Sequence, residues 1–117
     1  MKKLLLAFSL VMLSACATII PPVPHDPVMF GYAIDVKVGL SKISCDDKKV
    51  WDPIFDRLDV LKNYAEARKD PQADSIAKLD ETLNKAENSN NRAFCESALR
   101  ISKTRIDVVI DAWKGRK

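Results

Sequence analysis

The chain has 117 residues, 47% of them hydrophobic and 30% charged, with 19 Lys and Arg against 16 Asp and Glu. This length holds one small domain and excludes two-domain and long-solenoid architectures. The near balance of charges does not indicate a nucleic-acid-binding face, and a single histidine leaves little for catalysis or for zinc binding.

Residues 1–15 have the pattern of a signal peptide. Two lysines precede the apolar run LLLAFSLVML, and the small residues Ser14 and Ala15 stand before Cys16. The run is too short to remain as a transmembrane helix. The tetrapeptide LSAC that ends at Cys16 resembles the lipobox of bacterial lipoproteins, so we expect cleavage between Ala15 and Cys16.

The lipobox resemblance implies that the Cys16 thiol carries a diacylglycerol and that the new amino terminus is acylated. Several acyl chains, at about 0.8 kcal/mol per buried CH₂, hold a protein stably on a membrane. Ala17 stands where an Asp would favour inner-membrane retention in enterobacteria, so we expect an outer-membrane lipid anchor with the domain facing the periplasm. An ordinary signal peptide and a buried N-terminal helix are the alternatives.

Residues 16–26 predict an extended linker after the lipidated cysteine. The segment ATIIPPVPH contains three of the six prolines and has no amphipathic period. His25, the only histidine, lies in it and is interpreted as a solvated linker residue rather than a metal ligand or general base. Removal of residues 1–15 lowers the count of Lys and Arg from 19 to 17 against 16 acids, so the mature chain is nearly neutral.

Residues 27–117 predict an all-α domain, a small four-helix up-down bundle. Three Asp-Pro pairs, which begin at Asp26, Asp52 and Asp70, are interpreted as helix starts with the aspartate as N-cap. Apolar residues then recur at three- and four-residue spacing. This spacing predicts helices over residues 53–68, 71–87 and 92–113.

The segment before these helices is ambiguous. Residues 32–40 alternate apolar and polar side chains as a strand does. A helix over residues 27–45 also fits, with one apolar stripe through Phe30, Ile34, Val38, Ser41 and Cys45 beside Ala33, Val36, Leu40 and Ile43. Because a lone strand would have no partner among three helices, the helix is preferred.

Cys45 and Cys95 remain after lipidation, in a compartment where disulfides form. In an up-down-up-down bundle the end of the first helix and the start of the fourth lie at the same pole, which predicts a Cys45–Cys95 disulfide. Closing so long a loop stabilises the fold by about 4 kcal/mol in the chain-entropy model. Two buried free thiols, or a redox or metal site, are the alternatives, although no C-x-x-C pair is present.

The sequence offers little chemistry for catalysis. The only histidine lies in the linker, and the three glycines form no phosphate loop. We therefore expect no enzyme, no metal site and no cofactor other than the lipid on Cys16. Two groups of charged residues are interpreted as solvated faces rather than sites: the acids Asp46, Asp47, Asp52, Asp56 and Asp59, and the bases Arg100, Lys103 and Arg105 near Asp107.

The layout resembles the α-helical pilotins of type II secretion, of the PulS/OutS kind. These are short outer-membrane lipoproteins with a Pro-containing linker, four helices and a disulfide from the first helix region to the start of the last. The likeness covers most of the mature chain in layout. It rests on Cys16 and on Cys45 and Cys95 in the segments YAIDVKVGLSKISC and FCESALRISKTRIDVVID.

The pilotin resemblance implies a protein partner, a short C-terminal segment of a secretin. That segment would become helical in an apolar groove and be carried to the outer membrane. Neither nucleic acid nor a small-molecule substrate is expected. A phage or plasmid surface-exclusion or immunity lipoprotein, and a structural envelope lipoprotein, are the alternative functions.

Replacement of the proposed lipidation site tests the anchor. Cys16→Ser is expected to abolish labelling by radioactive fatty acid and to move the domain from the membrane to the soluble fraction, because no acyl chain can then be attached. Asp59→Asn, which leaves all three cysteines in place, is the control and should stay membrane-bound. An unchanged mass and location of the Cys16→Ser protein would contradict the lipoprotein assignment.

Overall fold

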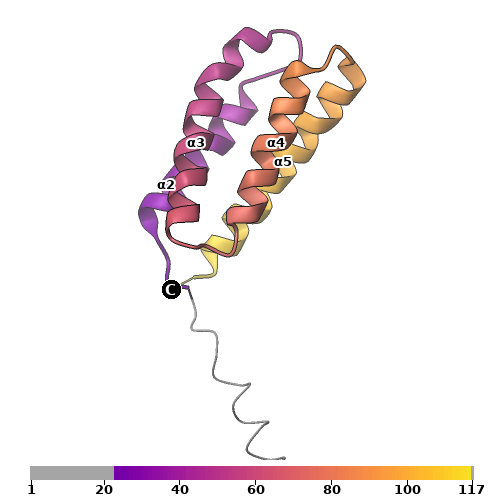
Figure 1. The fold of residues 1–117 in the computed structure, drawn as a ribbon. Helices are drawn as coiled ribbons and strands as arrows, with labels where there is room; N and C mark the ends of the chain where they lie inside the picture. The colour runs from indigo at the N-terminus through magenta and orange to yellow at the C-terminus, as the bar shows by residue number, and fades with distance from the viewer. Residues whose placement is uncertain (1–22, 117) are drawn as a thin grey trace, which may run out of the picture.

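The computed structural model describes residues 23–116, and this part of the chain is helical (Figure 1). Ala15, Cys16 and most of the predicted linker lie outside it. The described residues contain no strand, so the all-α prediction is confirmed and the strand alternative for residues 32–40 is wrong. The elements are α2 (Pro27–Ser41), the 3-10 helix η1 (Lys48–Trp51), α3 (Asp52–Ala67), α4 (Ala73–Asn88) and α5 (Arg92–Lys114).

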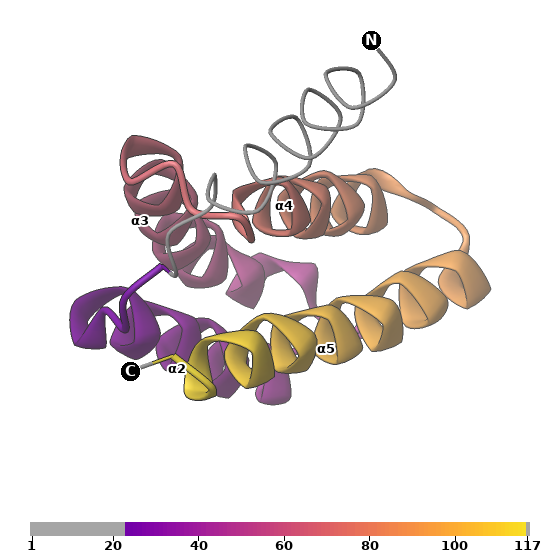
Figure 2. The same cartoon turned by 90° about the horizontal axis from the view of Figure 1, so that it is seen from below.

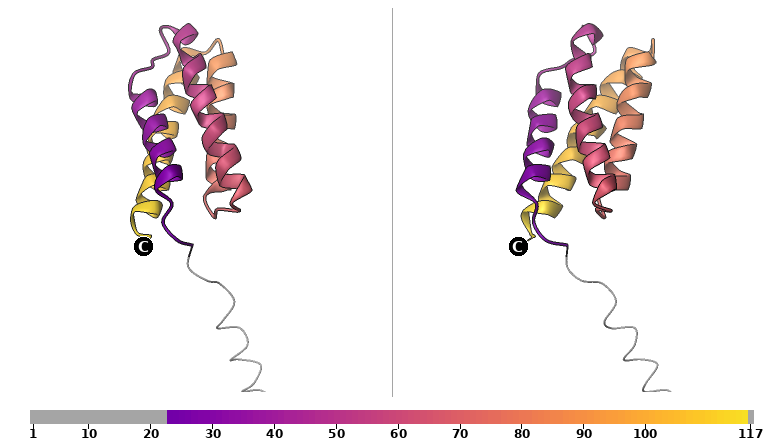
Figure 3. Two further views of the ribbon diagram at one scale, coloured as in Figure 1. Left: turned by 90° about the vertical axis from the view of Figure 1, so that its left-hand side faces the viewer. Right: turned by 60° about the vertical axis from the view of Figure 1, so that its left-hand side comes forward.

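The four α-helices form a ring of neighbours. α2 contacts α3 and α5, and α4 contacts the same two helices from the other side. Figure 2 shows α3 and α4 in one layer and α2 and α5 in the other. The start of α2 and the end of α5 lie at one pole, which we call the linker pole, and the α2–α3 and α4–α5 connections lie at the opposite pole (Figure 3). The predicted up-down bundle is therefore confirmed.

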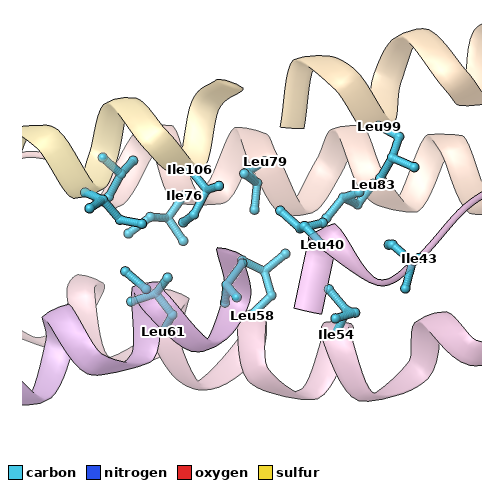
Figure 4. Packing of buried hydrophobic residues seen from close by; sticks show 14 of the residues in the cluster. Leu40, Ile43, Ile54, Leu58, Leu61, Ile76, Leu79, Leu83, Leu99 and Ile106 are labelled. Carbon is cyan, nitrogen blue, oxygen red and sulfur yellow. The ribbon is translucent and has the colours of Figure 1, made fainter. Parts of the chain in front are cut away.

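Each helix contributes one stripe of buried side chains to a single core (Figure 4). The three- and four-residue spacing of the stripes is the reason these segments are helical, because only that period places all the apolar groups on one side. The fully or nearly fully buried members include Met29, Ala33, Val36 and Leu40; Ile54, Leu58, Leu61 and Ala65; Ile76, Leu79, Leu83 and Ala86; and Cys95, Ile106, Val109, Ile110 and Trp113.

α2 differs from its prediction in its end and in its buried face. The helix stops at Ser41 rather than at Cys45. Ile34 and Val38, placed on the main predicted stripe, are 36% and 43% exposed, whereas the parallel stripe through Ala33, Val36 and Leu40 is buried. Apolar side chains lie on all sides of α2, so its period alone cannot select the face that turns inward.

Gly39 explains which face of α2 turns inward. The glycine is buried against α3, and a Cβ at this position would collide with the Ile54 side chain. The absence of a side chain lets the two helices approach closely at this point. Gly39 therefore permits the packing in which Ala33, Val36 and Leu40 are buried and Ile34 and Val38 are left outside.

The Cys45–Cys95 disulfide is present as predicted, with a Cα–Cα distance of 6.1 Å. Cys45 lies in the connection after α2, and Cys95 lies in the first turn of α5. The disulfide lies at the pole opposite the linker pole, and polar contacts stabilise the same end of the bundle. Arg92 pairs with Asp46 at 2.6 Å, and the Lys48 ammonium donates to the Ser89 carbonyl at 2.6 Å.

Of the three predicted Asp N-caps, one is confirmed. The Asp26 carboxylate accepts hydrogen bonds from the backbone amides of Val28 and Met29. Asp52 caps nothing, because η1 runs directly into α3 and Asp47 is the cap of η1. Asp70 precedes a turn, and α4 begins at Ala73 rather than at Pro71.

Asp70 has instead a buried role at the linker pole. Its carboxylate accepts from the Gln72 amide at 2.8 Å, from Trp113 Nε1 at 3.2 Å and from both terminal nitrogens of Arg116. These bonds tie the end of α5 to the α3–α4 turn. Asp26 ties the start of α2 to α3 in the same way, through Tyr64 Oη at 3.1 Å and Arg68 Nε at 3.1 Å.

The contacts of Asp70 also set its acidity. Burial by itself raises the pKa of Asp70, but the hydrogen bonds from Arg116, Gln72 and Trp113 outweigh burial and hold the pKa below its ordinary value of 3.8. A carboxylate whose folded-state pKa is lowered stabilises the fold above its unfolded pKa. That stabilisation is lost as the pH falls through the folded value.

Asp70→Asn is therefore expected to lower the free energy of unfolding by about 2 kcal/mol at pH 7, because the charge-assisted bonds to Arg116 are lost. As the pH falls below the ordinary value of 3.8, the difference from the wild type should shrink, because the unfolded chain binds the proton first and the folded carboxylate binds it only at its lower pKa. Urea denaturation followed by circular dichroism measures the free energy of unfolding at each pH. Asp107→Asn, which removes an exposed pair with Lys37, is the control and should cost less than about 1 kcal/mol. Equal stability of Asp70→Asn and wild type at pH 7 would contradict this role.

Candidate docking groove

The residues singled out from the sequence do not come together in a catalytic arrangement. The Cys45–Cys95 pair is a disulfide, Asp46 pairs with Arg92, and Asp47 caps η1. His25 is exposed, and its ring lies 5.5 Å from that of Phe30. Between residues 23 and 116 no three His, Cys, Asp or Glu side chains are grouped to hold a metal ion.

The outer face of α5 carries a row of exposed apolar side chains. Phe94, Ile101 and Val108 are 44%, 46% and 58% exposed. They stand seven residues apart, so they lie almost in line along the helix, as the a positions of a heptad do. The row extends over about 21 Å at 1.5 Å per residue. Single exposed apolar residues are ordinary, but a spaced row of them on one helix is typical of a contact surface.

The row lies in a groove between α5 and α4. One hollow of about 420 Å³ is lined by Ile101, Thr104 and Val108 of α5 and by Ser75 of α4. A second hollow of about 220 Å³ is lined by Phe94, Ile101, Ser97 and Ala98, with Thr82 and Lys85 of α4. Ile101 lines both hollows, so the two lie next to each other along α5, and together we call them the docking groove.

Small side chains line the docking groove between the apolar residues. Ser97 and Thr104 alternate with the three apolar residues at heptad d positions, and Ser75 and Thr82 of α4 lie opposite, also seven residues apart. Small hydroxyl side chains at these places leave room for larger side chains of a partner. A hydrogen bond of 3.2 Å from Arg105 to the Thr82 hydroxyl joins the two walls of the groove.

Two other hollows are closed by ion pairs. The one beside the disulfide, about 280 Å³, is lined by Asp46, Arg92 and Glu96, and Arg92 pairs with both acids. The one between α2 and α5, about 170 Å³, contains the Lys37–Asp107 pair at 2.8 Å. Lys103 lines both of these hollows and forms no ion pair within residues 23–116. The docking groove is the stronger candidate site because the row of exposed apolar side chains lines it.

Comparison with known proteins gives no relative: no family model, curated protein or solved structure matches the chain. Within residues 23–116 no helix is both long and apolar enough to cross a membrane. The assignment of function therefore depends on the sequence pattern and on the geometry of the domain.

The sequence contains the seven-residue row of the docking groove, but apolar periodicity alone does not distinguish this row from a buried stripe. The apolar spacing that predicts a helix over residues 92–113 does not separate Phe94, Ile101 and Val108 from the residues of the core. The buried stripe of α5 runs through Cys95, Leu99 and Ile106, so the seven-residue row falls on a different face. A second apolar row beside the core stripe, at heptad spacing, is the pattern that would have indicated it.

Proposed function

We propose that the protein is a lipid-anchored adaptor of the outer membrane that acts as a pilotin. In this proposal it binds a helical C-terminal segment of a secretin subunit in the docking groove and brings that subunit to the membrane. The observation that carries the proposal is the exposed row Phe94, Ile101 and Val108 together with the two hollows that it lines. An amphipathic helix laid along such a row is a common mode of peptide recognition.

The size of the row fits a carrier that later releases its client. Each of the three side chains is about half exposed, so covering it contributes about 1 kcal/mol. A client segment that folds on binding spends part of the interaction energy on its own ordering. The resulting affinity is moderate, and it permits transfer of the secretin segment once the subunit reaches the membrane.

The position of the groove fits a domain attached by its N-terminus. The chain enters the bundle at the linker pole. α5 begins at the opposite pole, where the disulfide lies, and ends at the linker pole (Figure 3). The docking groove therefore extends along the side of the bundle, with its Phe94 end far from the attachment point.

The proposal predicts that the groove is needed for secretin delivery. In a deletion strain, secretin multimers should mislocalise, and a plasmid copy of the wild-type chain should restore them to the outer membrane. Ile101→Asp should fail to restore them, because the charge disrupts apolar contact with the client helix. Membrane fractionation followed by immunoblotting of unheated samples measures the multimers.

Val60→Asp is the matched control, since Val60 is 48% exposed on α3, away from the groove, and it should restore delivery. Thermal unfolding of both variants shows that each is folded. Normal secretin multimers in the deletion strain would contradict the pilotin function. If entry of phage or plasmid rises in that strain instead, the surface-exclusion alternative is favoured.

A further inference from the structure

The charged side chains that line the docking groove all have the same sign. Arg100 and Arg105 line it from α5 and Lys85 lines it from α4, and no acid lines either of its hollows. This is a local feature, because the mature chain as a whole is nearly neutral. Lys85 pairs with Glu81 at 2.9 Å, so a partner that enters the groove meets an apolar floor with unpaired positive charge on its α5 side.

The two arginines are available to a partner. Within residues 23–116 neither Arg100 nor Arg105 forms an ion pair, whereas Arg92, Arg68 and Arg116 each pair with an aspartate. Arg105 donates to the Thr82 hydroxyl at 3.2 Å, and Arg100 donates to the Ser97 hydroxyl at 3.4 Å. A guanidinium has five N–H donors, so these hydroxyls orient each group and leave donors for a carboxylate.

We infer that the partner of the docking groove is an acidic amphipathic helix, with Asp or Glu on both sides of its apolar seam. This inference rests on the proposed function and adds the chemistry of the client. In a paired-helix geometry, residues beside the apolar seam contact the flanks of the facing helix, which is where Arg100 and Arg105 stand relative to Ile101 and Thr104. Carboxylates at those positions pair with the two guanidinium groups, whereas Arg100 and Arg105 repel a basic helix.

The charge of the groove also argues against a second copy of this chain as the occupant. Two copies that met through Phe94, Ile101 and Val108 would bring Arg100 and Arg105 of one chain against those of the other. Like charges at such close range oppose association. An acidic helix from another protein satisfies both the apolar row and the arginines.

Two synthetic peptides test the inference. Each is an amphipathic helix of about 15 residues, which matches the 21 Å or so of the row at 1.5 Å per residue. Both carry Leu at the same heptad a and d positions, and the flanking positions are Glu in one peptide and Lys in the other. Fluorescence anisotropy measures their binding to the full mature chain in detergent, at low and at moderate salt.

We expect the Glu-flanked peptide to bind at least tenfold more tightly than the Lys-flanked one at low salt. The ratio should fall as salt screens the exposed charges. Arg100→Glu together with Arg105→Glu should reverse the preference, while Lys69→Glu, at the α3–α4 turn, should leave it unchanged. Ile101→Asp should weaken binding of both peptides at least tenfold.

The outcomes separate this inference from the proposed function. Equal affinity for the two peptides, with both weakened by Ile101→Asp, would overturn the acidic partner and leave the helix-binding groove in place. Binding of neither peptide, or binding that Ile101→Asp does not change, would overturn both the groove and the inference. Concentration-dependent dimerisation of the free chain that Ile101→Asp abolishes would show that a second copy occupies the groove.

Discussion

The Cys45–Cys95 disulfide is the constraint on which the rest of the bundle depends, because it closes the ring of helices between its first and last members. α2 is apolar on all sides and joins α3 through an irregular connection, so its own sequence pattern holds it only weakly in one orientation. The disulfide fixes its C-terminal end against α5 at 6.1 Å between Cα atoms. Gly39 then sets its rotation against Ile54, and Asp26 fixes its start through Tyr64 and Arg68.

The disulfide holds α5 at its start and buried Asp70 holds it at its end, so the fold fixes the helix that carries the proposed site. Cys95 anchors its first turn, and the contacts of Trp113 and Arg116 with buried Asp70 anchor its last. Phe94 stands beside the disulfide cysteine at one end of the apolar row. A row held on a rigid helix presents its side chains at fixed spacing, so this side of the interface loses little conformational freedom on binding.

The sequence was sufficient for the class of fold, for most helix bounds and for the disulfide, because these follow from apolar spacing and from the poles of an up-down bundle. It did not predict the buried face of α2, since the choice depends on the contact of Gly39 with α3, which local pattern does not contain. It also misjudged Asp70, whose partners Trp113 and Arg116 lie more than forty positions away in the chain. The docking groove was missed because an exposed apolar row resembles a core stripe until neighbouring helices are placed.

The most direct test of the account is site-specific photo-crosslinking in the protein's own cells. A photoreactive amino acid is placed at Ile101 in one variant and at Val60 in another, and the crosslinked peptide is identified by mass spectrometry. The account predicts that position 101 crosslinks to an acidic C-terminal segment of a secretin and that position 60 does not. No adduct at position 101, or the same adduct from both positions, would contradict it.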